Sequence, residues 1–353
     1  MQKQVQFYDD KLGFEENKAQ GPFGDYANIT EPYKNSGEPQ YEFFGTPVYS
    51  PFGIAAGPLA APAFIKAGLD RGYDIVTIKS VRTDVFPLNE YPHVRPLKLT
   101  GDLKPGREKG VVVADKYSAP LAVVNSFGIP SVKPSVWQPM IKECFKLPGK
   151  GQALLVPFQG TARGKGRDDF VQDHVLGVQL VKETGAKVIE INLSCPNEGE
   201  SVLACFDTDI TERIVKAVRK AHPDITFTIK LAYFSDHTQL KELVRRVGAT
   251  VDGIAAINTI AAPIVDEDGK QFFPGRPTAG VSGAPVKWAG LEMTKLLKKF
   301  RKEFGYSYKI MGMGGVLSAA DFHEYRKAGA DYVMSVTGAM WNPNLAAEIK
   351  ASL

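Results

Sequence analysis

The stretch EINLSCPNEG, residues 190–199, places Cys195 between two asparagines at the end of a run with the composition of a buried strand. A thiolate can act as a base, and an ordinary thiol pKa of about 8.5 leaves a small part of it ionised at neutral pH. We therefore expect Cys195 to transfer a proton, although a free cysteine can also be a small packing residue. Cys144 and Cys205 lack comparable neighbours and are expected to be structural.

Four asparagines stand at comparable places, each at or just after an apolar run: Asn125, Asn192, Asn197 and Asn258. An amide offers one acceptor and two donors, so several amides directed at one point suit a flat ring that carries amides and carbonyls. A single asparagine at a strand end is more often a turn former. The repetition of the pattern favours a binding site for such a ring.

Lysines and glycines at other strand ends indicate a phosphate and a redox-active ring. Lys79 and Lys230 each end an apolar strand, where an ammonium either lies in solvent or faces an electron-rich group. The runs MGMGGV (311–316) and SVTGAM (335–340) expose main-chain N–H groups that can hold a phosphate, with tight turns as the alternative. Flavin mononucleotide (FMN) fits this combination, because a lysine can stabilise negative charge on the ring. The GxGxxG fingerprint of dinucleotide sites is absent near the amino terminus.

The elements that must position these residues form a repeated unit, a short apolar strand followed by a segment with helical spacing. Near-continuous apolar strands alternating with helices predict a parallel sheet, and eight such units favour a closed (β/α)8 TIM barrel. An open doubly wound sheet is the alternative. The expected strands are FGIAA (52–56), DIVTIK (74–79), ALLVPFQ (153–159), KVIEIN (187–192), TFTIK (226–230), GIAAIN (253–258), YKIMGM (308–313) and DYVMSV (331–336).

Two segments lie outside this repeat. Residues 1–45 are expected to be an N-terminal extension, and residues 80–152 a long excursion after the second strand with an extra apolar run, LAVVN (121–125). The FMN-binding barrel is expected over residues 46–353, with the excursion contributing to its active-site face. Function in a parallel barrel is built at the carboxyl ends of the strands, so the residues named above should meet at one mouth.

Composition narrows the classes of function. With 43 basic and 39 acidic side chains among 353 residues, a net charge of +4 gives weak support for an anionic small ligand and almost none for nucleic acid. Three cysteines without CxxC or paired Cys/His spacing indicate neither disulfides nor a metal site, and fit a cytoplasmic, reducing compartment. No stretch reaches about 18 uninterrupted apolar residues, so no membrane span is expected, while peripheral membrane contact stays open.

From about residue 42 onward the chain resembles the class 1, cysteine-using type of the dihydroorotate dehydrogenase family. INLSCPN (191–197) resembles the most specific motif of that family, and VNSFGIPS (124–131) resembles its substrate-binding loop. The two flavin lysines of the family correspond to those in TIKS (77–80) and TIKLAYFSD (228–236). INTI (257–260), AGVSGAPVK (279–287) and GMGGV (312–316) follow in the family's order.

The resemblance implies that Cys195 removes the C5 proton of (S)-dihydroorotate while a hydride leaves C6 for FMN, giving orotate in de novo pyrimidine (UMP) biosynthesis. The implied pyrimidine-binding residues are Lys79, Asn125, Asn192, Asn197, Asn258 and Thr259. The implied FMN-binding residues are Ala56, Gly57, Lys79, Ser80, Asn192, Lys230, Gly283, Gly314, Gly315, Thr337 and Gly338. Three features depart from the family pattern: the Thr-Gly order at 337–338, the length of residues 93–120, and the 45-residue extension.

The resemblance also implies a second electron acceptor and a homodimer. Fumarate is favoured, as in the homodimeric class 1A type, with NAD through a partner subunit or a quinone as other options. One alternative function is that of a related FMN oxidoreductase acting on another dihydropyrimidine, a group that tends to have histidine in place of Asn197 and whose iron–sulfur cysteines are missing here. The other is a flavin-binding scaffold without catalysis.

Overall fold

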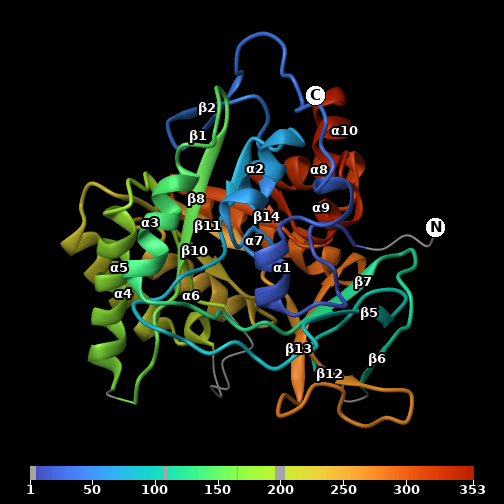
Figure 1. The fold of residues 1–353 in the computed structure, drawn as a ribbon. Helices are drawn as coiled ribbons and strands as arrows, with labels where there is room; N and C mark the ends of the chain where they lie inside the picture. The colour runs from blue at the N-terminus through green and yellow to red at the C-terminus, as the bar shows by residue number, and fades with distance from the viewer. Residues whose placement is uncertain (1–4, 107–109, 165, 195–202) are drawn as a thin grey trace.

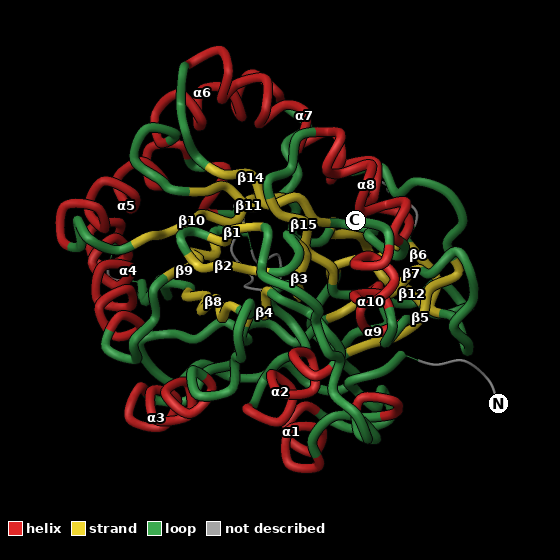
Figure 2. The backbone as a smooth tube through the Cα atoms, turned by 90° about the horizontal axis from the view of Figure 1, so that it is seen from above, coloured by secondary structure: helices red, strands yellow, loops and turns green. Residues whose placement is uncertain are grey.

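Eight parallel strands form the central barrel of the computed structural model, which describes residues 5–106, 110–164, 166–194 and 203–353. Each strand pairs with its neighbours in chain order, and β15 pairs with β3 to complete the ring (Figure 2). The predicted TIM barrel is therefore confirmed, and the open sheet is excluded. The strands are β3 (Phe52–Ile54), β4 (Ile75–Thr77), β8 (Ala153–Phe158), β9 (Val188–Asn192), β10 (Thr226–Leu231), β11 (Gly253–Ala256), β14 (Lys309–Met313) and β15 (Tyr332–Ser335).

Helices surround the barrel on its outer face (Figures 1 and 2). The segments 168–186, 208–222 and 238–248 have the helical spacing of apolar residues that is expected between the strands, and they form most of α4, α5 and α6. Within the described ranges, no helix is long and apolar enough to cross a bilayer. The helices that follow the extension are α2 (Pro62–Asp70), α3 (Pro134–Cys144), α4 (Arg167–Lys182), α5 (Thr208–Ala221), α6 (His237–Val247), α7 (Lys287–Phe304), α8 (Ala319–Ala328), α9 (Thr337–Trp341) and α10 (Leu345–Ala351).

Alternation along each strand separates two apolar cores. On β9, Ile189 and Ile191 belong to the large core between strands and helices, whereas Val188 belongs to the core inside the barrel. Because successive side chains of a strand point to opposite faces, Glu190 and Asn192 share the inner face with Val188. The functional side chains at strand ends are thus continuations of the barrel interior.

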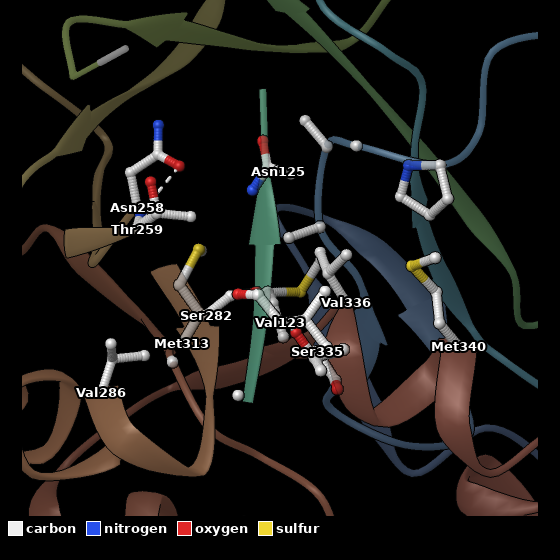
Figure 3. A pocket seen from close by; sticks show the side chains of 18 of the residues that line it. Val123, Asn125, Asn258, Thr259, Ser282, Val286, Met313, Ser335, Val336 and Met340 are labelled. Atoms are coloured by element: carbon white, nitrogen blue, oxygen red, sulfur yellow. Dashed lines mark hydrogen bonds between the residues drawn. The ribbon is translucent and has the colours of Figure 1, made fainter. Parts of the chain in front are cut away.

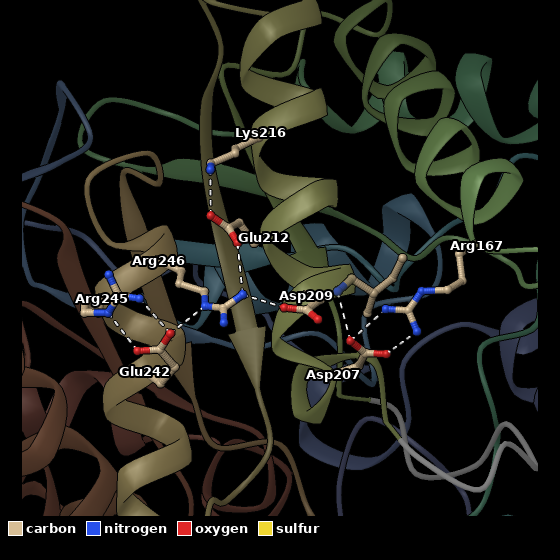
Figure 4. Close-up of polar contacts among 9 residues, drawn as sticks. Arg167, Asp207, Asp209, Glu212, Lys216, Glu242, Arg245 and Arg246 are labelled. Carbon is tan, nitrogen blue, oxygen red and sulfur yellow. Dashed lines mark hydrogen bonds and ion pairs between the residues drawn. The ribbon is translucent and has the colours of Figure 1, made fainter.

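Helices α4, α5 and α6 are joined at their surfaces by ion pairs (Figure 4). Arg167 donates to both carboxylate oxygens of Asp207, at 2.7 and 2.9 Å, and the same carboxylate caps α5 by accepting the N–H of Ile210. Arg246 of α6 reaches Asp209 and Glu212 of α5. Asp207 therefore fixes the start of the helix that follows the INLSCPN segment.

A second, smaller closed sheet stands beside the barrel mouth (Figure 1). Its third strand corresponds to the apolar run expected at 121–125. The other four strands are not predicted from the sequence, and two of them lie near residue 270, outside the excursion. The strands are β5 (Val94–Lys98), β6 (Val111–Val113), β7 (Ala122–Asn125), β12 (Ile260–Val265) and β13 (Thr278–Gly283).

The extension and the three residues that follow it contribute elements at both ends of the barrel. A hairpin of β1 (Tyr41–Phe43) and β2 (Thr46–Val48) buries Phe43 and Val48 against the first residues of the barrel strands, such as Ile75. In Figure 2 this hairpin lies within the ring of strands, so it fills the amino-terminal end. Helix α1 (Phe14–Gln20) and the short 3-10 turn η1 (Gly24–Tyr26) lie near the opposite end. The other 3-10 turns are η2 (Ala204–Phe206) and η3 (Ala284–Val286).

Candidate active site

A pocket lies at the carboxyl ends of the barrel strands, with β7 and β13 of the small sheet forming one wall (Figure 3). Figure 3 shows Asn125 on β7, with Asn258 and Thr259 on one side and Ser335 and Val336 on the other. Fourteen of the residues predicted for the site line this pocket. They are Ala56, Gly57, Lys79, Ser80, Asn125, Asn192, Lys230, Asn258, Thr259, Gly283, Gly314, Gly315, Thr337 and Gly338.

Two predicted residues, Cys195 and Asn197, lie outside the described residues. Ser194 immediately precedes them, is fully buried, and lies between two of the predicted amides. Its N–H and hydroxyl donate to Asn192 Oδ1 at 3.2 and 3.1 Å, and its carbonyl accepts Asn258 Nδ2–H at 3.0 Å. Asn192 and Asn258 therefore fix the main chain at Ser194. The sequence interpretation missed Ser194, although the serine in INLSCPN is next to the cysteine.

The remaining cysteines have a different environment. Cys144 on α3 and Cys205 in η2 are both fully buried, and burial raises the pKa of each thiol to about 12. A thiol with such a pKa stays neutral and is a poor base near pH 7. Both residues therefore pack as small apolar side chains.

Lys230 lies on the inner face of β10, almost fully buried, with Nζ 4.0 Å from Oε1 of Glu190 on the neighbouring strand. Burial raises the pKa of the Glu190 carboxyl, and the positive charge of Lys230 partly offsets this shift. Glu190 Oε1 accepts no hydrogen bond in the described part of the chain. Glu190 was not predicted for the site. Its position could have indicated it, because an acidic residue two positions before Asn192 in an apolar strand lies on the same face of that strand as Asn192.

Lys79 follows β4 and enters the pocket from the opposite side of the ring of strands. Its ammonium lies 5.0 Å from the ring centroid of Phe127 and 5.4 Å from that of Phe14. Phe127 lines the pocket as part of VNSFGIPS, whereas Phe14 belongs to the extension. Val5 and Tyr8 of the extension also line the pocket, which the sequence interpretation did not foresee.

The glycine-rich loops after β14 and β15 have little room for side chains. Gly314 and Gly315 have φ angles of +118° and +65°. A Cβ on Gly315 would lie 2.6 Å from Lys287 Cβ, and one on Gly338 would lie 2.1 Å from the carbonyl oxygen of Val316. Ser335 donates to the same Val316 carbonyl at 2.7 Å and so ties the two loops together. The φ angles of Gly314 and Gly315 and the close contacts at Gly315 and Gly338 therefore favour glycine, and all three residues line the pocket.

Comparison with known proteins gives two kinds of match. The family model described as dihydroorotate dehydrogenase matches residues 99–353. A dihydroorotate dehydrogenase of Dictyostelium discoideum is 30% identical over 357 residues, covering 96% of this chain and 95% of that protein. The chain belongs to the dihydroorotate dehydrogenase family. It is accordingly an oxidoreductase of the group that acts on CH–CH bonds.

Relatives within the family include both class 1 types. The catalytic subunit of dihydroorotate dehydrogenase B (NAD(+)) of Methanocaldococcus jannaschii is 28% identical over 216 residues, which is 61% of this chain and 66% of that protein. Dihydroorotate dehydrogenase A (fumarate) of Limosilactobacillus reuteri is 28% identical over 200 residues, 56% and 62% of the two chains. These relatives agree with the resemblance of the sequence to the class 1 type. The match to the Dictyostelium protein leaves at most about 14 residues of this chain unmatched, so it includes most of the extension.

Proposed function

We propose that the chain oxidises (S)-dihydroorotate to orotate in pyrimidine biosynthesis, with FMN as hydride acceptor and Cys195 as base. The observation that carries the proposal is the convergence of two lysines, three described carboxamides and the glycine loops on one pocket. The chain also belongs to the dihydroorotate dehydrogenase family. Dihydroorotate supplies the flat ring that the amides lead us to expect, and FMN supplies the phosphate that the glycines lead us to expect.

The pocket residues fit FMN in shape and charge. The backbone at Gly314, Gly315 and Gly338 lines the pocket and carries no side chain, so it can approach a phosphate closely. Lys230 supplies a buried positive charge for the ring. When bound, FMN accepts the hydride from the substrate. The residues that would hold it are Ala56, Gly57, Lys79, Ser80, Asn192, Lys230, Gly283, Gly314, Gly315, Thr337 and Gly338.

The protein's own part in the reaction is to orient the pyrimidine and remove one proton. The substrate carboxylate is attracted by Lys79, and the amides of Asn125, Asn192, Asn197 and Asn258, with Thr259, match its ring amides and carbonyls. Cys195 takes the proton from C5, and the electron pair of that C–H bond becomes the C5=C6 double bond as hydride leaves C6. The hydrogen bonds of Ser194, the residue before Cys195 in the sequence, hold its main chain beside the same amides that are proposed to orient the ring.

The proposed second substrate is fumarate, and the proposed assembly is a cytoplasmic homodimer. The choice of fumarate follows the relatives named dihydroorotate dehydrogenase A (fumarate). The homodimer follows the family resemblance of the sequence, and the compartment follows its three unpaired cysteines. Assays of the purified protein with fumarate, a quinone or NAD as the single acceptor identify the second substrate. Analytical sedimentation measures the oligomeric state. Turnover with NAD or quinone but not with fumarate would overturn this part alone.

The substrate is tested by mixing the FMN-loaded protein with dihydroorotate in the absence of oxygen. We expect rapid bleaching of the flavin and formation of orotate. Dihydrouracil, which lacks the carboxylate, serves as the comparison and should bleach the flavin far more slowly because Lys79 has no anion to bind. Faster bleaching by dihydrouracil would favour the other dihydropyrimidine function, and no bleaching by either would favour a scaffold.

The base is tested with Cys195→Ala. We expect this variant to keep its yellow FMN yet lose at least about 100-fold in the rate of flavin reduction near neutral pH, the usual contribution of a general base. Cys144→Ala is the matched control, since its thiol is buried on α3 and stays neutral. Reduction of the Cys195→Ala flavin at the wild-type rate would exclude Cys195 as the base.

A further inference from the structure

Glu190 lies on the inner face of β9, below the floor of the pocket. Asn192, two residues farther along the same face, lines the pocket, so the carboxyl lies roughly 7 Å deeper in the barrel. Lys230 also lines the pocket, and its Nζ is 4.0 Å from Glu190 Oε1. The ammonium therefore stands between the buried carboxyl and a ring bound in the pocket.

The surroundings of this carboxyl inside the barrel carry few charges. Titratable groups that face the interior from the described strands are Lys230 on β10, Lys79 at the pocket end of β4, and Tyr332 on β15 near the amino-terminal hairpin. Of these, Lys230 is the one whose charge shifts the pKa of Glu190. The uncharged inner residues of the neighbouring strands are Ala55, Thr77, Leu155, Pro157, Thr228, Ala255, Met311, Met313 and Met334.

Two threonine hydroxyls in the interior can serve either ionisation state of Glu190. Thr228 is its register partner on β10, and Thr77 follows Ile75 on the inner face of β4. Both threonines are buried, and their Oγ1 atoms, like Glu190 Oε1, have no hydrogen-bond partner within the described residues. A hydroxyl can donate to a carboxylate or accept from a carboxylic acid. The interior therefore does not force one ionisation state on the carboxyl.

Hydride transfer changes the balance of charge around this pair. In the proposed reaction, a hydride leaves C6 of the substrate and brings one negative charge into the pocket beside Lys230. With Glu190 ionised, the ammonium then faces two negative charges in a region that water screens little. Addition of a solvent proton to the carboxylate forms one O–H bond, moves no electrons and removes one of these charges. Burial already raises the pKa of Glu190, which makes this protonation easier.

We propose that Glu190 binds a solvent proton when FMN is reduced and releases it when FMN is reoxidised, so that the barrel interior keeps its net charge. This inference rests on the proposed function, and the proton is separate from the one that Cys195 removes. A unit charge at roughly 8 Å and an effective dielectric of about 20 makes the carboxylate about 30-fold more basic. At the pH midway between the two pKa values of the carboxyl, reduction should therefore draw in about 0.7 proton per flavin.

The test reduces the FMN-loaded protein electrochemically, without dihydroorotate, and counts protons with a pH indicator in weakly buffered solution from about pH 5 to 9. At its optimum pH, the wild type should take up about 0.7 proton per flavin more than Glu190→Gln. Infrared difference spectra of the reduced and oxidised protein should contain a band of a protonated carboxyl that shifts in heavy water and is missing from Glu190→Gln. Glu190→Asp retains a titratable group and should keep such a band.

Asp74→Asn is the matched control. Asp74 is also a fully buried acid whose pKa is raised by burial, and it pairs with Lys350 at 2.8 Å, but it precedes β4 at the end of the barrel opposite the pocket. Its replacement should leave the extra proton and the band in place. Equal proton counts in the wild type and Glu190→Gln at every pH, a wild type without the band, or an equal loss in Asp74→Asn would each overturn the inference. Failure of the wild-type protein to hold FMN would instead overturn the proposed function.

Discussion

Glu190 and Lys230 place opposite charges inside the barrel, next to the residues proposed to bind the ring. The ammonium and the carboxylate oxygen are 4.0 Å apart, and both side chains are almost completely shielded from solvent. A charge buried at this depth affects nearby groups more strongly than one at the surface, because little water screens it. The ionisation state of Glu190 should therefore influence a redox ring bound beside Lys230.

We expect Glu190→Gln to raise the midpoint potential of bound FMN at alkaline pH and to leave it unchanged at acid pH. Burial raises the pKa of this carboxyl, so it is already neutral at the acid end, and the substitution removes a negative charge only above that pKa. A unit charge at roughly 8 Å and an effective dielectric of about 20 is worth about 2 kcal/mol, which corresponds to tens of millivolts for a two-electron couple. Redox titration at several pH values measures the effect, with Thr228→Val as an uncharged control on β10. Coinciding potentials at every pH would show that the carboxyl does not act on the ring.

At the scale of elements, the barrel strands could be predicted from the sequence but the small sheet could not. Runs such as DIVTIK and KVIEIN are apolar and β-branched, and each is followed by a helical segment, which is the pattern of a βα unit. The small sheet depends instead on pairing between remote segments, as where Val111 pairs with Ile264. Its strand β6 has three residues, and β13 contains two glycines, so neither carries a strong strand signal. Of the residues that the small sheet contributes to the pocket wall, the sequence therefore predicts only Asn125 and Gly283.

The start of α5 offers a test of how the helices support the site. Asp207→Ala removes both the cap on Ile210 and the paired hydrogen bonds from Arg167, so we expect a loss of about 1 to 2 kcal/mol in the free energy of unfolding. Asp207→Asn keeps an acceptor for the cap and should lose less. Urea unfolding compares the two variants with the wild type. An equal loss in both would mean that the charge pair, rather than the cap, dominates.

At the scale of the whole molecule, His174 links stability to pH. This side chain is fully buried on α4, where Nε2 accepts the Gly160 N–H at 3.3 Å and Nδ1 lies 2.8 Å from the Phe170 carbonyl. Burial lowers the pKa of the imidazole to about 4 from an ordinary value of 6.5. The unfolded chain therefore binds a proton between these values that the folded chain does not, and stability falls as pH falls through this window.

We expect acidification from pH 7 to pH 4 to cost the wild-type protein about 3 kcal/mol through this one group. His174→Gln retains a side chain able to accept the Gly160 N–H but has no proton to gain, so its unfolding free energy should fall less steeply over the same range. Urea unfolding at half-unit pH steps gives both slopes. Identical slopes would show that protonation of His174 is not coupled to unfolding.

Some residues of the site could be predicted from the sequence, and others could not. Residues at strand ends could be assigned because parallel strands bring their carboxyl ends to one edge, so Lys79, Lys230 and Asn258 needed no further information. The extension could not be assigned in this way. Its residues have no helical or strand period near Tyr8, and their contacts are with partners such as Met340, more than 300 positions away.

The pairing of β3 with β15 has a consequence for synthesis on the ribosome. Phe52 of β3 pairs with Val333 of β15. One edge of the first barrel strand therefore stays unpaired until 281 further residues have been synthesised. At about 5 to 20 residues per second this takes roughly 15 to 55 seconds, during which the nascent chain carries an uncovered apolar strand. Such an edge invites pairing with other chains. Recombinant yield should therefore improve when translation is accompanied by more chaperone, with soluble and aggregated fractions as the measure.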